Sequence, residues 1–230
     1  MIRIFIGYDP REAVAFHTAS HSLLARSSHP VAITPLALSN LSGLMTRPRD
    51  PLQSTDFSFS RFLTPLLCDF QGWGIYMDCD VLVRDDIAAL WACRDERYAV
   101  QVVKQEQAVS KAVKFLGAHQ VAYGKKNWSS VMLFNNARCT QLTAEYVNTA
   151  QGLDLHQFKW LSDDALIGDL PARWNHLVGS SPPSKDAAVV HFTEGGPYFE
   201  PWKKCEFADE WFRERSRMLH ADSPAAKTPV

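Results

Sequence analysis

The chain has 230 residues, of which 46% are hydrophobic and 11% aromatic, so it can fill one sizeable hydrophobic core. Its 24 basic and 25 acidic residues leave a formal net charge of −1, which argues against a large basic surface for nucleic acid. The sequence has no apolar run of the ~20 residues that span a bilayer, no secretory cleavage pattern and no Cys-x-x-Cys pair, so we expect a cytoplasmic protein without disulfides or a zinc knuckle.

The first hundred residues alternate apolar strands with amphipathic helices. We expect strands over 3–8, 31–36 and 75–77, helices over 12–26 and 58–68, and a surface loop over 38–55, where prolines and a glycine interrupt any period. A strand, a helix and a strand at this spacing form a right-handed βαβ unit with parallel strands. The chain is therefore expected to begin like half of a nucleotide-binding α/β fold.

The second half of the chain continues this alternation. We expect strands over 98–103, 131–134 and 188–192, helices over 87–91 and 140–150, and a helical turn over 163–167, with no assignment for 104–126. Alternating strands and helices place the chain in the α/β class. Residues 1–220 are expected to form one domain, followed by a small, polar and disordered tail over 221–230.

A last helix is expected over 208–219, where aromatic residues alternate with Arg213, Arg215 and Arg217. A basic, aromatic helix can lie on the anionic inner face of a membrane as a peripheral contact. It can equally dock its aromatic face onto the domain, as amphipathic helices commonly do. The sequence leaves both alternatives open.

Two aspartates, Asp78 and Asp80, follow the strand expected over 75–77. They lie at its carboxyl end, where open α/β sheets bind ligands, and two carboxylates there can hold a hard metal ion with a phosphate-bearing substrate. The alternative is an Asp-rich turn, of the kind that Asp85 and Asp86 form before the next helix. The pattern by itself allows either role.

A metal site of this kind needs a further protein ligand, and His191 is the best candidate. It follows an apolar strand and precedes Gly195 and Gly196, whose backbone can approach a phosphate closely. The alternative is a strand-end histidine that backbone groups satisfy. We predict that Asp78, Asp80 and His191 bind one divalent ion.

Several motifs follow one another in a recognisable order along residues 1–205. They are Ile6 to Asp9, Ser60-Arg61-Phe62, Tyr76 to Val81, Trp128 to Asn135, Asp163 to Leu166, and His191 to Trp202. In this order they resemble the family 8 type glycosyltransferases, a retaining, sugar-nucleotide-dependent group that includes glycogenin and bacterial lipopolysaccharide galactosyltransferases. The resemblance implies a GT-A fold, a Rossmann-like mixed and mainly parallel sheet flanked by helices.

The resemblance also implies a reaction. Asp78, Asp80 and His191 would hold Mn²⁺ or Mg²⁺ against the diphosphate of a nucleotide sugar, a UDP-sugar above all, and the sugar would pass with retention to a glycan or lipid-linked glycan. The implied site residues are Gly7, Tyr8 and Asp9 near uridine, Arg61 near the acidic pair, Gly195, Gly196 and Lys203 near the diphosphate, and Ser129, Ser130, Asp163 and Asp164 beside sugar and acceptor. Ser130, Asp163 and Asp164 are the catalytic candidates.

The chain departs from the family pattern in two places. Glu200 occupies the position where the family usually has lysine. Either Lys203 or Lys204 supplies the positive charge near the diphosphate, which is the alternative we favour, or this segment lies away from the substrate. Asp163 stands where the family usually has a neutral amide. It could stabilise or attack the oxocarbenium-like centre, or it could simply cap the helical turn that follows.

Two other functions compete with this interpretation. A haloacid-dehalogenase-type phosphatase also carries Asp-x-Asp after an apolar strand, although Val81 stands where such enzymes favour glycine and a βαβ unit precedes the motif. A non-catalytic transferase that only binds a sugar nucleotide is suggested by Glu200. Manganese-dependent release of uridine diphosphate would distinguish the transferase from both.

Overall fold

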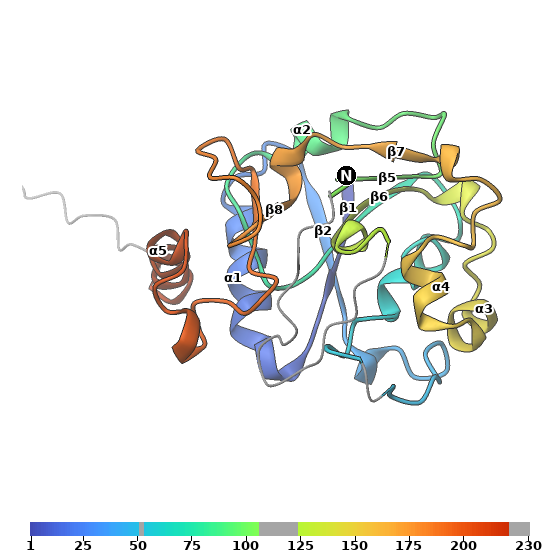
Figure 1. The fold of residues 1–230 in the computed structure, drawn as a ribbon, viewed down its shortest axis with the longest axis horizontal. Helices are drawn as coiled ribbons and strands as arrows, with labels where there is room; N and C mark the ends of the chain where they lie inside the picture. Colours follow the sequence, from blue (N-terminus) through green and yellow to red (C-terminus); the bar gives the residue numbers. More distant parts are fainter. Residues whose placement is uncertain (51–52, 106–123, 221–230) are drawn as a thin grey trace, which may run out of the picture.

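A six-stranded sheet lies at the centre of the computed structural model, which describes residues 1–50, 53–105 and 124–220 (Figure 1). Its order is β2-β1-β3-β6-β5-β7, with β1 at Ile2–Gly7, β2 at Val31–Leu36, β3 at Trp73–Met77, β5 at Val100–Val102, β6 at Val131–Asn135 and β7 at Ile167–Asp169. β1 pairs in parallel with β2 and β3, as β5 does with β7, whereas β6 is antiparallel to both its neighbours. The expected α/β fold with a mixed, mainly parallel sheet is confirmed.

Helices cover both faces of this sheet. α1 (Ala13–Leu24) and α2 (Ile87–Ala92) pack on one face, and α3 (Ala144–Thr149) and α4 (Gly152–His156) pack on the other. The last helix, α5 (Ala208–Leu219), packs on α1. β1 is apolar apart from Arg3, because it is buried on both sides. Ile4 shares one hydrophobic cluster with Phe16 of α1, and Phe5 shares the opposite cluster with Leu155 of α4. β1, α1 and β2 form the predicted parallel βαβ unit.

A second sheet has three strands, the first of which follows β3 in the chain. It contains β4 (Val81–Val83), β9 (Val189–His191) and β8 (His176–Leu177), in the order β4-β9-β8. β4 runs antiparallel to β9, with Val81 opposite His191. The turn over 78–80 therefore joins the two sheets, and this register sets the position of the histidine.

The last helix, α5, packs along α1 at one side of the molecule (Figure 1). Trp211 is buried, and the carboxylate of Glu214 accepts hydrogen bonds from His21 (2.6 Å) and Arg26 (2.8 Å) of the segment containing α1. The docking alternative for this helix is therefore confirmed, while its arginines stay exposed. None of the helices in the described ranges combines the length and apolar character of a bilayer span.

The sequence-based expectations differ from the structure in a few elements. The helix expected over 58–68 is wrong: the segment forms two 3₁₀ turns, Ser60–Leu63 and Leu66–Cys68, on either side of Pro65, which lacks a backbone N–H for a continuous helix. The helical turn expected over 163–167 is a 3₁₀ helix, Asp164–Leu166, that leads directly into the unpredicted strand β7. The disorder expected over 221–230 concerns residues outside the described ranges.

Candidate metal centre and pocket

The backbone brings the three predicted ligands together at the junction of the two sheets. The N–H of Asp78 donates to the carbonyl of Ser130, the residue just before the neighbouring β6 (2.9 Å), which holds the turn in line with the central sheet. The N–H of Phe192 donates to the carbonyl of Asp80 (2.9 Å), which continues the pairing of β4 with β9. Both ends of the Asp-x-Asp turn are thus tied to backbone, and His191 lies beside it.

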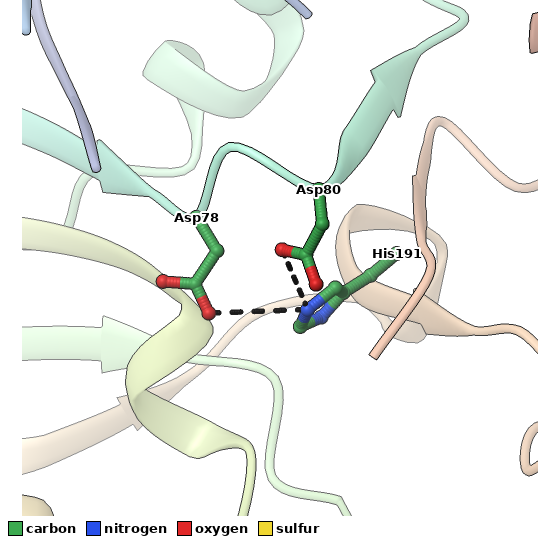
Figure 2. A group of neighbouring side chains, drawn as sticks. All are labelled: Asp78, Asp80 and His191. Atoms are coloured by element: carbon green, nitrogen blue, oxygen red, sulfur yellow. Dashed lines mark ion pairs between the residues drawn. The ribbon is translucent and has the colours of Figure 1, made fainter. Parts of the chain in front are cut away.

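Figure 2 shows the side chains of Asp78, Asp80 and His191 directed toward one another. The Nε2 atom of His191 lies 3.3 Å from Asp80 Oδ1 and 3.8 Å from Asp78 Oδ2. One ligand atom from each residue lies within 4.8 Å of the other two, and the group is largely buried. This oxygen, oxygen and nitrogen set has the spacing and chemistry to hold a divalent metal ion.

A hydrogen bond to Asn175 holds the ring of His191 with its Nε2 atom toward the two aspartates. The side-chain amide of Asn175 donates to the carbonyl of Asn127 (3.1 Å), so its oxygen faces His191 Nδ1, 3.0 Å away. Nδ1 then carries a ring proton, so Nε2 is the nitrogen that can offer its lone pair to a cation. Asn175 lies where the outer hydrogen-bond partner of a metal-binding histidine usually lies. It carries no motif, and sequence reasoning missed it.

Arg61 lies against Asp78 of the acidic pair, as the family resemblance implied. Its Nη1 atom is 3.0 Å from Asp78 Oδ1 and donates to the carbonyl of Ser129 (2.9 Å), and Arg61 is buried. Tyr76 donates its hydroxyl to Asp78 Oδ1 (2.6 Å). Burial raises the pKa of Asp78, the guanidinium of Arg61 works against this, and the negative charge of Asp80 raises it again. A cation at this point would relieve that repulsion.

A buried acid that sequence reasoning missed lies close to the same turn. Glu12, just before α1, is 1% exposed, and its Oε2 atom accepts from Tyr198 Oη (3.4 Å) and Cys79 Sγ (3.6 Å). No partner within the described residues reaches its Oε1 atom. Burial first, and then the charges of Asp80 and Asp9, raise the pKa of Glu12 from its ordinary 4.5 to about 8. Near neutral pH this carboxyl is mostly protonated.

A pocket of about 660 Å³ opens beside the three ligands, a volume typical of small-molecule sites. Asp78, Asp80, His191 and Arg61 line one part of it, and the segment 149–153 lines another. Ser129 and Ser130 also line the pocket. His156 of α4 joins them as a pocket residue that the sequence did not indicate, because α4 itself was not expected.

The three residues that the resemblance places near uridine, Gly7, Tyr8 and Asp9, contact other parts of the chain. Asp9 is buried, accepts from the backbone and guanidinium of Arg11, and accepts from the N–H of Asp56 (3.1 Å). It thereby anchors the loop whose residues 53–55 line the pocket. A Cβ at Gly7 would lie 2.4 Å from Phe57, and Tyr8 packs edge to face on a neighbouring ring. The pocket lining itself does not include these three residues.

The glycines after β9 permit close aromatic packing. Gly195 has φ +144°, and a Cβ there would lie 2.9 Å from Trp202, whereas a Cβ at Gly196 would lie 2.1 Å from Tyr198. Lys203 forms a 2.5 Å ion pair with Glu200, so the unusual glutamate has a cation beside it. Neither glycine nor Lys203 lines the pocket at the metal ligands.

Only one of the three predicted catalytic residues lines the pocket. Ser130 lines the pocket. Asp163 is exposed and accepts from the N–H of Ala165 (2.8 Å), which is the capping role considered as its alternative. Asp164 pairs with Lys125 (2.5 Å), and neither aspartate lines the pocket. A part for Asp163 or Asp164 in a reaction stays a prediction.

The amino-acid sequence is similar to that of a plant protein over nearly its whole length. It is 46% identical over 221 residues to Protein CDI of Arabidopsis thaliana, an alignment that covers 92% of this chain and 85% of the plant protein. No family model matches the sequence.

Solved structures with a similar fold are glycosyltransferases. The bifunctional glycosyltransferase WbbM superposes with a TM-score of 0.67 and 15% identity, over 97% of this chain and 50% of WbbM, so this chain spans half of that protein. The galactosyltransferase LgtC, solved with donor and acceptor sugar analogues, gives a TM-score of 0.60 at 13% identity over 95% of this chain and 97% of LgtC. GlyE of Streptococcus pneumoniae TIGR4 gives 0.60 at 15% identity, over 95% of this chain and 62% of GlyE. The fold is that of GT-A glycosyltransferases.

Proposed function

The chain belongs to the same family as Protein CDI of Arabidopsis thaliana, and from this premise and its site we propose that it is a metal-dependent glycosyltransferase. It would move a sugar from a nucleotide-diphosphate sugar, a UDP-sugar above all, to a hydroxyl of a glycan or lipid-linked glycan. The observation that carries the proposal is the convergence of Asp78, Asp80 and His191 at the wall of a pocket within a GT-A fold.

The side chains of this chain would each have a defined task. Asp78 and Asp80 supply anionic oxygens, and His191 supplies Nε2, held in place by Asn175. A divalent cation bound there supplies charge neutralisation for the departing diphosphate. Manganese suits this set better than magnesium, because one ligand is an imidazole nitrogen and magnesium strongly favours oxygen.

Arg61 would keep the metal end of the pocket in place. It holds Asp78 on one side and the carbonyl of Ser129 on the other, so the carboxylate presents its second oxygen toward His191. Ser129 and Ser130 offer polar groups farther along the pocket for the sugar. We further predict that the reaction retains the configuration of the sugar, which rests on the family 8 resemblance. We also predict a cytoplasmic location and a membrane contact through the exposed arginines of α5.

The test is release of uridine diphosphate from a panel of UDP-sugars, with and without Mn²⁺, together with Mn²⁺ binding measured by electron paramagnetic resonance. Asp80→Asn and His191→Ala should lose both Mn²⁺ binding and turnover. Asp85→Asn is the matched control, because Asp85 lies in the same acidic segment but pairs with Arg173 (2.7 Å) outside the pocket.

Three results would contradict the proposal. Release of inorganic phosphate in place of uridine diphosphate would indicate the phosphatase. Binding of UDP-sugars without turnover on any acceptor would indicate the non-catalytic binder. Full turnover in His191→Ala would remove the imidazole from the metal site.

A further inference from the structure

Arg47 lies in the loop after β2 and is fixed at the wall of the pocket that contains the metal ligands. Its backbone N–H donates to the side-chain oxygen of Asn148 (2.9 Å), and its Nη1 atom donates to the carbonyl of Val147 (3.0 Å). Its guanidinium carbon lies 4.1 Å from the centre of the Phe59 ring, in a cation–π contact. Because the backbone, one edge and one face of the guanidinium are all in contact, the side chain is held in a defined orientation.

The guanidinium of Arg47 is half-buried but forms no ion pair with a carboxylate of the described ranges. The other arginine of this pocket, Arg61, pairs with Asp78 (3.0 Å). Burial lowers the pKa of Arg47 from its ordinary value, and the charge of Asp50 opposes this shift. The carbonyl of Val147 accepts from one of the five N–H groups of the guanidinium, so a partly desolvated cation keeps donors for a bound anion.

Arg47 lies along the pocket wall from the metal ligands and not beside them. The ring of Phe59, on which Arg47 stacks, contacts the ring of His156 (centroids 5.9 Å apart), and His156 contacts Ser129 (2.8 Å). Only the last of these reaches the metal end, where the carbonyl of Ser129 accepts from Arg61 (2.9 Å). A diphosphate bound at the metal would therefore leave the guanidinium of Arg47 for a different anionic group in the same pocket.

We propose that Arg47 is a specificity-determining residue that binds an oxyanion, a carboxylate or a phosphate, on a sugar substrate of this pocket. The planar guanidinium fork matches the two oxygens of such a group, and stacking on Phe59 leaves the edge of the fork available. The inference rests on the proposed transferase function, which it deepens by naming the substrate class, an anionic sugar. The oxyanion belongs either to the transferred sugar or to the acceptor, and its chemistry is the same in both.

Pairs of probes that share a sugar but differ in charge distinguish these two sources. UDP-glucuronate and UDP-glucose differ by a carboxylate on the sugar that is transferred. Methyl glucuronide and methyl glucoside differ in the same way on the acceptor side, and glucose 6-phosphate and glucose differ by a phosphate. Dissociation constants are measured by calorimetry with Mn²⁺ present, and the acceptor-side probes are measured with UDP also bound.

Three variants accompany the wild type. Arg47→Gln removes the charge and keeps an amide, whereas Arg47→Lys keeps the charge and loses the fork. Arg49→Gln is the matched control, because Arg49 lies in the same loop but pairs with Asp56 and does not line the pocket.

We expect the wild type to bind the anionic member of at least one pair about 10- to 100-fold more tightly than the neutral member, as a charge-assisted hydrogen bond predicts. Arg47→Gln should abolish this preference while binding UDP, Mn²⁺ and the neutral member like the wild type. Arg47→Lys should keep part of the preference, and Arg49→Gln should keep all of it. A preference within the UDP-sugar pair assigns the oxyanion to the transferred sugar, and one within the other pairs assigns it to the acceptor.

The inference is overturned if the wild type prefers no anionic probe, or if the preference persists in Arg47→Gln. An equal loss in Arg49→Gln would also overturn it, because the overall charge of the loop would then be responsible. If circular dichroism shows that Arg47→Gln does not fold, Arg47→Lys decides: a reduced preference supports the inference and an unchanged one overturns it. If sugars bind but none is transferred, the proposed function fails while these dissociation constants still test Arg47.

Discussion

Replacing Glu12 by glutamine should change how the stability of the protein depends on pH. Glu12 is buried and its pKa is about 8, whereas an unfolded chain loses the same proton near its ordinary 4.5. Between these values the folded state binds more protons than the unfolded state, so the free energy of unfolding falls as pH rises from about 4.5 to about 8. Above about 8 this contribution stays constant.

The size of the effect follows from the difference between the two pKa values. At about 1.36 kcal/mol per pH unit, the step from 4.5 to about 8 corresponds to a loss of up to about 5 kcal/mol across that window. Glutamine has nearly the same shape and no charge to bury. Glu12→Gln should therefore match the wild type near pH 5 and exceed it in stability by several kcal/mol near pH 8.5.

The assay is urea unfolding at these two pH values in the presence of a chelator, so that no metal near Asp80 offsets the charge of the acid. A second variant, Tyr198→Phe, removes a hydrogen bond that lowers the pKa of Glu12, so the pH window over which its stability falls should begin at the same pH and extend to higher pH. If the wild type and Glu12→Gln lose stability in parallel between pH 5 and pH 8.5, the reasoning about this buried acid is refuted.

Three further predictions concern the metal centre, the core and α5. Asn175→Ala should weaken Mn²⁺ binding by about 10- to 100-fold in calorimetry, because His191 loses the partner that fixes its ring, and unchanged affinity would refute this role. Gly7→Ala should lower the free energy of unfolding in urea by about 1–3 kcal/mol, since its Cβ would lie 2.4 Å from Phe57; equal stability would mean that the ring moves freely. Burial raises the pKa of Glu214, but Arg26 and a histidine hold it below its ordinary 4.5, so the contact stabilises at neutral pH and is lost as pH falls through that lowered value. Glu214→Gln should accordingly destabilise the protein at pH 7 and much less in acid, and identical thermal unfolding at pH 7 would contradict this.

Local sequence patterns were sufficient for much of the fold. The continuous apolar runs at β1, β3 and β6 and the helical spacing of α1 predicted the α/β class, because burial on one or both faces demands these patterns. Asp78 and Asp80 could be placed at a ligand-binding edge since they directly follow an apolar strand. His191 could be nominated because it also ends one. In each case the signal lies within a few residues of the feature that it predicts.

Only the tertiary structure decided which residues meet. The register of β4 on β9 places His191 beside Asp80, and this pairing joins segments 110 positions apart in the sequence. Asn175, Glu12 and His156 reach the site from elements without a motif, so their roles depend on long-range packing that no local pattern encodes. The sequence by itself thus determined the class of fold and the residue types of the candidate metal site, since these depend on local periodicity and side-chain chemistry. Tertiary contacts decided which residues orient these side chains, shift their pKa values and surround them, because a side chain's neighbours in space depend on the whole folded chain.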